Sequence, residues 1–457
     1  MLLFLSIRRF FAILTFVTDL DSYVNKKVDF KFNGAALRFD LSHALFSSFD
    51  IDAGTRLLLK TVARDPVLAS SRRILDEGCG VGVIGLCAAK AFPAAEVLLR
   101  DRDSLAVAFA ERNRIANRLR GAAARTEPHA GEARIERAPP RVEWGLLADG
   151  REAGPYDFVL SNLPAKAGAP VLAYFFDRLS GKRGSPLLVP GGRAGIVIVK
   201  PLAEATAAWI AGAGLAMVAS GRGSMHLAVV VERRAESLAG RAVDAVAEAA
   251  AAGEAAEGPE LSAYIRGEAR FKLADLSYRA RGFWGLPEFD TAGYGSSVAA
   301  ELASRVCEGL AFGDALFMEP GVGHMAVWAS RALGLKSVTA ASRDELSLRA
   351  AGINLSSLPG RSRPEYRTLD ALNAVDLTAG SFDLMIESPD VVPERDWTGP
   401  AWDLAGRLLR PGGLYLAYCS PTEMTRLEKR RPVGSAAWKL LGRKRKKGFV
   451  AAAWRKV

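Results

Sequence analysis

The chain contains two copies of one sequence pattern, and this internal repeat restricts its fold more than any other feature. Four blocks of the first copy return in the same order in the second: ILDEGCGVGVIGL (74–86), VLLRDRDSLAVAFAERN (97–113), YDFVLSNLPAKAG (156–168) and LLVPGGRAGIVIV (187–199), against ALFMEPGVGHMAV (315–327), VTAASRDELSLRAAGIN (338–354), FDLMIESPDVV (382–392) and LLRPGGLYLAY (408–418). Three pairs of matching residues keep one spacing of 241 positions: Gly80 with Gly321, Asp103 with Asp344, and Asn113 with Asn354. Chance does not hold a register over that distance, so we interpret the chain as a tandem duplication.

Each copy alternates short apolar runs with longer helical stretches. The runs at 74–75, 97–99 and 158–160 predict buried parallel strands, and residues 104–117 predict a helix. Residues 28–42 predict a β-hairpin with a turn at Asn33-Gly34. Such alternation is typical of an α/β fold with a doubly wound sheet. The Ala- and Glu-rich stretch 236–260 predicts a linker or helix, so we expect two domains, at 28–235 and 261–457.

Charge, cysteine spacing and the apolar N-terminal run indicate which partners, metals and compartments to expect. The formal net charge of +11 is compatible with a polyanionic partner such as RNA. None of the four cysteines forms a CxxC pair and the four histidines are scattered, so we expect no metal site and a reducing cytoplasm. The apolar extension 1–27 carries Arg8 and Arg9 inside a run shorter than the roughly 20 residues of a membrane span, which argues against one. We expect a monomer.

A glycine-rich turn follows the first strand of the first copy. It begins at Asp76 and places glycine at positions 78, 80 and 82, so that the backbone can turn tightly and a ligand can approach the next helix. Asp101 ends the second strand, where its carboxylate can accept hydrogen bonds from both hydroxyls of a ribose. Enzymes that bind a dinucleotide use a similar glycine-rich turn, so the turn alone is weak evidence for the type of cofactor. These features together predict a site for a nucleoside cofactor.

The same residues resemble the small-domain class of S-adenosylmethionine-dependent methyltransferases. Asp103, Ala106, Ala110 and Asn113 follow the run D-x-D-P-x-A-L-x-x-A-x-x-N of that class, and ALFSSFDIDAGTRLLL (44–59) is similar to its lead-in. The resemblance implies two tandem Rossmann-like methyltransferase units, each with a seven-stranded, mostly parallel sheet, and S-adenosylmethionine as the cofactor. It places ten residues at the cofactor: Phe46, Ser47, Asp52, Gly54, Thr55, Asp76, Gly78, Gly80, Gly82 and Asp101.

The loop SNLPAKAG (161–168) matches the Asn-Pro-Pro-aromatic motif of amino-methyltransferases. An exocyclic amine on a base is a poor nucleophile, because its lone pair is delocalised into the ring. The Asn162 side-chain carbonyl and the Leu163 backbone carbonyl can accept its two N–H groups and free that lone pair, while Pro164 fixes the backbone. Catalysis then rests on positioning and needs no strong base. Ala165 stands where an aromatic residue would stack on the base, so stacking must come from elsewhere.

The tandem arrangement is shared with bacterial ribosomal RNA guanine-N2 methyltransferases. This resemblance implies methyl transfer to a guanine nitrogen, the exocyclic N2, in structured RNA and above all in ribosomal RNA. Three alternatives stay open. Asn-Leu-Pro also resembles the loop of transfer RNA guanine-N1 methyltransferases, which would need a base to remove the N1 proton. Asn-Pro loops also serve methyltransferases of protein side-chain amides, and a non-catalytic RNA-binding factor could keep the same fold.

The second copy has lost the polar groups of the predicted site. Three positions have changed: Glu319 for Gly78, Ser342 for Asp101 and Ser388 for Asn162. We therefore expect a degenerate unit that serves structure and RNA recognition. In the ribosomal RNA family the N-terminal copy is the degenerate one, so this chain has the opposite order.

A basic run lies near the C-terminus, in the last predicted hairpin. Its five consecutive charges can neutralise several phosphates of an RNA partner: Arg443, Lys444, Arg445, Lys446 and Lys447. Lys166 in the predicted catalytic loop is a further candidate phosphate contact. The alternative for both is a solvated surface.

Overall fold

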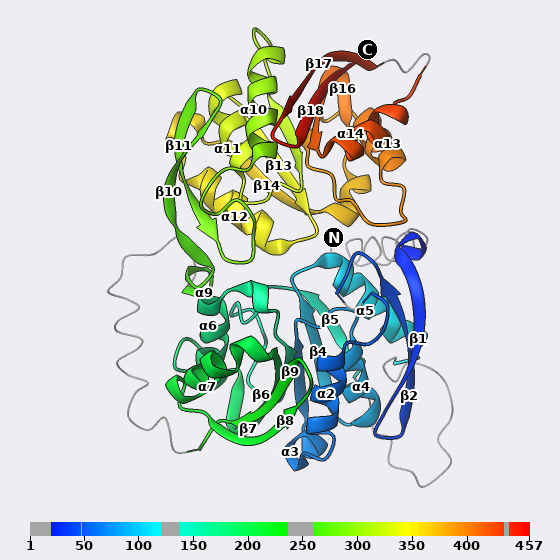
Figure 1. Cartoon of the computed structure of the whole chain (residues 1–457), viewed down its shortest axis with the longest axis vertical. Coiled ribbons are helices and arrows are strands. Elements are labelled where there is room, and N and C mark those ends of the chain that lie inside the picture. The colour runs from blue at the N-terminus through cyan, green and yellow to red at the C-terminus, as the bar shows by residue number, and fades with distance from the viewer. Residues whose placement is uncertain (1–19, 47, 120–137, 236–258, 434–437) are drawn as a thin grey trace, which may run out of the picture. The chain divides into compact units, whose positions relative to one another are not determined.

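The structure is a computed structural model that describes residues 20–46, 48–119, 138–235, 259–433 and 438–457. The chain divides into two compact units, Met1–Tyr264 and Ile265–Val457 (Figure 1). Most of the predicted apolar extension and of the predicted linker lies outside the described residues, at 1–19 and 236–258. No helix in the described ranges has the length and apolar character needed to cross a membrane.

The first unit is built on a seven-stranded sheet with the order β5-β4-β3-β6-β7-β9-β8. Its strands are β3 (Arg73–Glu77), β4 (Glu96–Asp101), β5 (Arg141–Trp144), β6 (Tyr156–Asn162), β7 (Leu188–Val199), β8 (Ala216–Arg222) and β9 (His226–Glu232). All neighbours pair in parallel except β9, which is antiparallel to both β7 and β8. The apolar runs predicted as buried strands lie in β3, β4 and β6, near the centre of this sheet.

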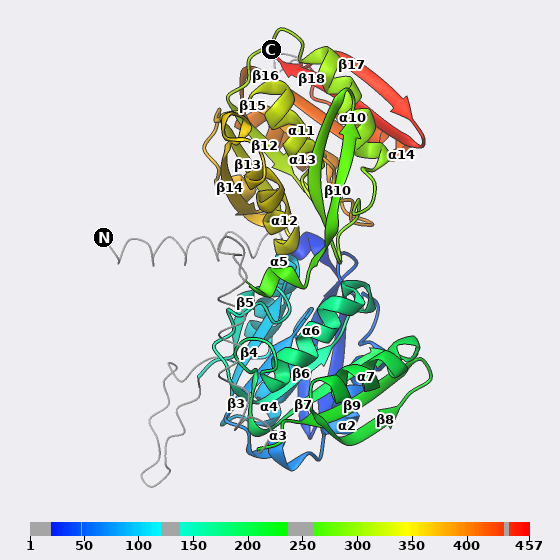
Figure 2. The same cartoon turned by 90° about the vertical axis from the view of Figure 1, so that its left-hand side faces the viewer.

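Helices cover both faces of the sheet (Figures 1 and 2). One group, in which α4 contacts both α2 and α5, consists of α2 (Ala53–Val62), α4 (Val83–Ala91) and α5 (Ser104–Ala116). The others are α3 (Pro66–Ser70) and the contacting pair α6 (Ala169–Ser180) and α7 (Ala203–Gly212). Short turns of 3-10 helix are η1 (Asp21–Tyr23), η2 (Ala165–Ala167) and η3 (Lys200–Leu202), and α9 (Pro259–Ser262) ends the unit. The unit is therefore doubly wound, as predicted.

The second unit has the same topology, with the sheet order β14-β13-β12-β15-β16-β18-β17. Its strands are β12 (Asp314–Met318), β13 (Ser337–Ser342), β14 (Glu365–Asp370), β15 (Phe382–Glu387), β16 (Leu409–Cys419), β17 (Trp438–Lys446) and β18 (Phe449–Lys456). Its helices are α10 (Tyr294–Val306), α11 (His324–Leu333), α12 (Glu345–Ser356), α13 (Thr398–Leu408) and α14 (Pro421–Lys429), with 3-10 turns η4 (Gly360–Ser362) and η5 (Ala371–Asp376). The prediction of two tandem Rossmann-like units is confirmed.

A two-stranded hairpin precedes each sheet. The first joins β1 (Val24–Phe32) to β2 (Ala35–Ser42) through the predicted turn at Asn33-Gly34, where both residues have positive φ. The second joins β10 (Ile265–Leu273) to β11 (Leu276–Phe283), and Figure 2 shows it beside α10. Both hairpins have a two-residue turn and a register shift near the start of the first strand, so the duplication extends to irregular details.

A buried asparagine ties each hairpin to the glycine loop of its unit. The Asn113 amide accepts a hydrogen bond from Asp40 N (2.8 Å) and donates to Asp40 O (3.1 Å) and Val81 O (2.9 Å). Asn354 makes the equivalent three bonds in the second unit, to Arg281 N, Arg281 O and Val322 O. The repeated Asn of the sequence pattern is thus a structural clamp, which secures the turn that follows the first strand of each sheet.

Candidate active site

The glycine loop connects the carboxyl end of β3 to the start of α4. Its glycines at 78, 80 and 82 have φ of +75°, +54° and +88°, a region that side chains with a Cβ disfavour. A Cβ at Gly78 or Gly80 would meet no described atom within 4 Å, so the space above these two glycines is open. A Cβ at Gly82 would lie 3.1 Å from the Ala110 Cβ, so this glycine lets α4 approach α5. The loop therefore combines an open cradle with a close helix contact.

Two acidic side chains border this cradle. Asp101, at the end of β4, accepts hydrogen bonds from Gly80 N (2.8 Å) and Asp103 N (2.9 Å), and burial raises the pKa of its carboxyl. Asp76 in β3 is fully buried and accepts a bond from Gly85 N (2.7 Å) through Oδ2. Its Oδ1 has no hydrogen-bond partner among the described residues, and burial raises the pKa of this carboxyl to about 7. A buried carboxylate oxygen without a partner is a position that a ligand donor can satisfy.

The predicted catalytic asparagine is held in one orientation by the start of α2. Its amide nitrogen, Asn162 Nδ2, donates to Asp52 Oδ2 and to Thr55 Oγ1, both at 3.1 Å. Asp52 is also the N-cap of α2, since its side chain accepts from Thr55 N. Because a carboxylate can only accept, the amide nitrogen must face Asp52, and the carbonyl Oδ1 faces away. In the described part of the chain, Asn162 Oδ1 has no partner and is free to accept a donor from a ligand.

The remaining predicted site residues lie on the same carboxyl edge of the sheet. Leu163 is buried and its N–H bonds to Val197 O (3.0 Å), while Pro164 leads into η2. Lys166 is exposed within η2. Gly54 sits between two side chains, since a Cβ there would lie 2.7 Å from Asp52 Oδ2 and 3.0 Å from the ring of His226. His226 at the start of β9 was not predicted from the sequence.

Phe46 and Ser47 are the first two residues that the sequence predicts at the cofactor. Phe46 is 74% exposed, and Ser47 lies outside the described residues. Asp52 and Thr55, predicted beside the cofactor, contact the predicted catalytic asparagine. The roles of all these residues in binding stay predictions. Within the described ranges, no three His, Cys, Asp or Glu side chains gather as metal ligands would.

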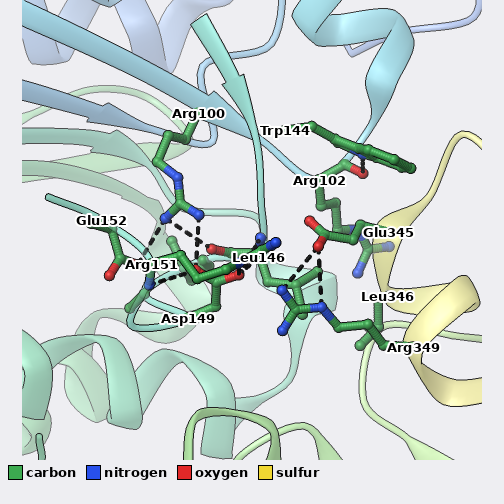
Figure 3. A network of polar contacts seen from close by, with 12 residues as sticks. Arg100, Arg102, Trp144, Leu146, Asp149, Arg151, Glu152, Glu345, Leu346 and Arg349 are labelled. Atoms are coloured by element: carbon green, nitrogen blue, oxygen red, sulfur yellow. Dashed lines mark hydrogen bonds and ion pairs between the residues drawn. The ribbon is translucent and has the colours of Figure 1, made fainter. Parts of the chain in front are cut away.

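A buried charge network next to the glycine loop was missed by the sequence reasoning (Figure 3). The Arg100 guanidinium in β4 bonds to Asp149 Oδ1 and Glu152 Oε1, both at 2.8 Å, and lies 3.5 Å from Glu77 Oε1. All four side chains are almost fully buried, and Glu77 and Arg100 are register partners in neighbouring strands. A Cβ at Gly145 would lie 1.9 Å from Arg100 Nη2, so glycine is required there. The network fixes the loop after β5 against the carboxyl ends of β3 and β4.

The second unit fills the equivalent position with its own side chain. Glu319, which replaces the first glycine of the loop, has φ of +52°. Its carboxylate accepts hydrogen bonds from Ser342 Oγ (2.5 Å) and Arg343 N (3.1 Å). Burial raises the pKa of Glu319 to about 7. The end of β13 carries Ser342 where β4 carries Asp101, and the Glu319 carboxylate from the loop lies against this serine. The carboxylate therefore occupies space that a cofactor ribose would need.

The basic run of the last hairpin is partly neutralised within the second unit. Lys444 and Lys446 both form ion pairs with Glu301 of α10, the first at 2.5 Å, and they hold the pKa of that carboxyl at about 2. Arg443 pairs with Glu428 at 3.2 Å. Of the five predicted charges, only Arg445 and Lys447 have no ion-pair partner in the described residues. The first four residues of the run lie on β17, an edge strand, where lysine discourages pairing with another chain, and Lys447 lies in the turn that follows.

Comparison with known proteins agrees with this arrangement. Residues 36–210 match the model of the methyltransferase small domain family. The ribosomal RNA small subunit methyltransferase C of Mannheimia succiniciproducens is 33% identical over 153 residues, which are 34% of this chain and 38% of that protein. The protein of the same name from Chromohalobacter salexigens is 31% identical over 170 residues, 36% of this chain and 43% of that protein. The matched regions thus span less than half of these relatives.

A solved structure has a similar fold over nearly the whole chain. The 16S rRNA N2 G1207 methyltransferase of T. thermophilus, in complex with AdoMet and guanosine, superposes with a TM-score of 0.62 and 17% identity, covering 96% of this chain and 100% of that one. At this identity the likeness concerns the fold alone, and it extends over both units. Together with the glycine loop, the family match shows that residues 36–210 are similar to the methyltransferase small domain, and this part of the chain resembles the ribosomal RNA small subunit methyltransferases C of these bacteria.

Proposed function

We propose that the first unit transfers a methyl group from S-adenosylmethionine to the exocyclic N2 of a guanine in small-subunit ribosomal RNA. One observation carries this proposal. Asp52 and Thr55 fix the Asn162 amide so that its carbonyl oxygen is turned away from them and has no partner among the residues that the structure describes. A free amide oxygen at the carboxyl edge of the sheet, beside an open glycine cradle, suits an amine that must be oriented for attack.

The residues around the glycine loop fit the proposed cofactor. S-adenosylmethionine supplies an electrophilic methyl group on a positively charged sulfur. The open space at Gly78 and Gly80 admits a ligand close to the backbone, and Asp101 stands beside it with lone pairs for ribose hydroxyls. Asp76 Oδ1, which has no hydrogen-bond partner in the described ranges, can accept a hydrogen bond from the amino group of the cofactor. In the second unit Glu319 takes up the corresponding position, which favours a single cofactor site per chain.

The chemistry assigned to the protein is the orientation of the guanine amine. Asn162 Oδ1 would accept one N–H of the amine and the Leu163 carbonyl would accept the other, so that the nitrogen lone pair is left free for attack. Asp52 prevents a 180° flip of the Asn162 amide, because the flip would place Asn162 Oδ1 against Asp52 Oδ2, and neither oxygen can donate a hydrogen bond. Once the methyl group has been transferred, the nitrogen carries an extra proton, which it releases to water. No strong base is therefore assigned among the described residues.

RNA and a cytoplasmic setting belong to the same proposal. The relatives that match the first unit carry the name of ribosomal RNA methyltransferases, and the chain has a net charge of +11. Arg445 and Lys447, which have no ion-pair partner in the described residues, and Lys166 in the catalytic loop are the phosphate contacts we favour. All four cysteines are buried and free, as suits a reducing compartment.

Transfer of labelled methyl groups from S-adenosylmethionine tests the function. The acceptors are naked ribosomal RNA, small ribosomal subunits, transfer RNA and bulk protein. We expect label in ribosomal RNA or in subunits, and mapping should place it on N2 of guanine. Label in transfer RNA at guanine N1 would favour the ring-nitrogen alternative, and label in protein would overturn the RNA assignment.

Three variants separate the roles of the residues. Asn162→Ala should abolish transfer while cofactor affinity is kept, and Asp101→Ala should weaken cofactor binding strongly. Ser388→Ala changes the matching position of the second unit and should leave both quantities unchanged. Full activity of Asn162→Ala would remove the loop from the mechanism, and unchanged cofactor affinity of Asp101→Ala would remove the ribose assignment.

A further inference from the structure

The catalytic loop lacks a group to cover the face of the target base. Ala165 follows Pro164 at the position where an aromatic ring would stack, and it forms part of η2 together with Lys166 and Ala167. A methyl side chain offers little surface to a purine. A base that has left its stack in RNA loses favourable contacts, and aromatic side chains usually replace them. The site therefore needs a stacking surface from another element.

The segment between β2 and α2 presents such a surface. Phe49 is 66% exposed, although it is a large apolar side chain. Its ring contacts His43 edge-on, with 5.0 Å between ring centroids and an interplanar angle of 71°. Phe49 lies three residues before Asp52, so their Cα atoms are at most about 11 Å apart. Because Asp52 binds Asn162, the short segment that carries this ring also holds the predicted catalytic amide.

The exposure of Phe49 is not a consequence of a loosely held backbone. On one side, Asn25 Nδ2 donates to Ser48 O at 2.7 Å. On the other, Ile51 is buried and its carbonyl accepts from Arg56 Nε at 3.1 Å. Asp50 forms an ion pair with Arg56 at 2.8 Å. The residues before and after Phe49 are therefore anchored, and its ring is held outward against His43 instead of joining the core.

We infer that Phe49 is the platform on which the target guanine stacks, with His43 as the residue that positions its ring. The inference rests on the proposed function and names the residue that takes over from the missing aromatic of the catalytic loop. A planar purine suits the exposed ring because stacking on an aromatic face works for any base, while Asn162 reads the exocyclic amine. Phe49 then contributes to substrate binding and not to the transfer step.

Binding of guanosine to the protein saturated with S-adenosylhomocysteine tests the platform directly. We expect Phe49→Ala to raise the Kd for guanosine about tenfold, since one stacked base contributes that much or more. Phe49→Trp should keep or improve the affinity. Phe49→Leu retains apolar volume without an aromatic face and should behave like the alanine variant. Met217→Ala, at a 50% exposed residue near the start of the edge strand β8, is the matched control.

Methyl transfer to ribosomal RNA gives a second readout. Phe49→Ala should raise KM for the RNA about tenfold and leave kcat and cofactor affinity close to those of the wild type. Equal Kd for guanosine and equal KM in wild type and Phe49→Ala would overturn the inference. A variant that loses affinity for whole subunits but binds guanosine and naked RNA normally would show that Phe49 contacts protein, which also overturns it. If the wild type transfers no methyl group to RNA, the proposed function fails, and the guanosine titration still decides the role of Phe49.

Discussion

The buried clamp of the first unit gives a quantitative test of how the repeat stabilises the fold. Asn113 is fully buried, and its amide makes three hydrogen bonds of 2.8, 3.1 and 2.9 Å to Asp40 N, Asp40 O and Val81 O. Asn113→Ala removes all three and leaves backbone groups of the hairpin and of the glycine loop without partners. At about 1 kcal/mol for each bond, the free energy of unfolding should fall by about 3 kcal/mol. Since the same residue secures the glycine loop, cofactor affinity should fall as well.

Urea unfolding followed by hydrogen exchange resolves the two units and measures this loss. Exchange is needed because a chain with two domains need not unfold in one step. Asn354→Ala is the matched control, since it removes the same three bonds from the second unit and should leave cofactor affinity unchanged. If Asn113→Ala unfolds within about 1 kcal/mol of the wild type, the three bonds do not carry the energy that we assign to them.

Further predictions concern packing and pH. Gly145→Ala should destabilise the first unit by about 3 kcal/mol or more in urea unfolding, because its Cβ would lie 1.9 Å from the buried Arg100 guanidinium; wild-type stability would contradict the network. Burial raises the pKa of Asp76 to about 7, and a carboxylate must be ionised to hold the cofactor amino group, so affinity for S-adenosylmethionine should rise about tenfold between about pH 6 and 8. In titration calorimetry, Asp76→Asn should lose this dependence. Burial also raises the pKa of Glu319 and of Glu387 to about 7. Since the folded second unit then binds more protons than the unfolded chain, its stability should fall as the pH rises from about 5 to 8, and Glu319→Gln should flatten that profile.

The sequence predicted those features that depend on local pattern. The glycine turn, the hairpin turn at Asn33-Gly34 and the strands around Leu75, Leu98 and Val159 follow from residues that are close together in the chain. The repeat added the topology, because two copies of one pattern must fold alike. Each of these predictions needed only spacing and residue type.

The sequence did not predict the contacts that join distant segments. Asp52 and Asn162 are 110 residues apart, and no periodicity signals that one holds the amide of the other. Arg100 is a charged residue in an apolar strand, which could have indicated a buried partner. However, its partners Asp149 and Glu152 lie in a loop whose path is set only by the folded sheet. Such contacts depend on where chains cross, and residue type alone does not determine that.

The side chain of Glu319 has a consequence for how this protein can change. If Ser342 alone became aspartate again, its carboxylate would face that of Glu319, which now lies 2.5 Å from the serine hydroxyl. If Glu319 alone became glycine, the loop would open but the serine could not replace the missing acid. Ser342→Asp alone would place two carboxylates against each other, and Glu319→Gly alone would leave no carboxylate at this position. Only the two substitutions together would reproduce the arrangement of the first unit. The second unit is therefore held in its present form by two mutually dependent positions, which makes this difference between the two copies difficult to reverse.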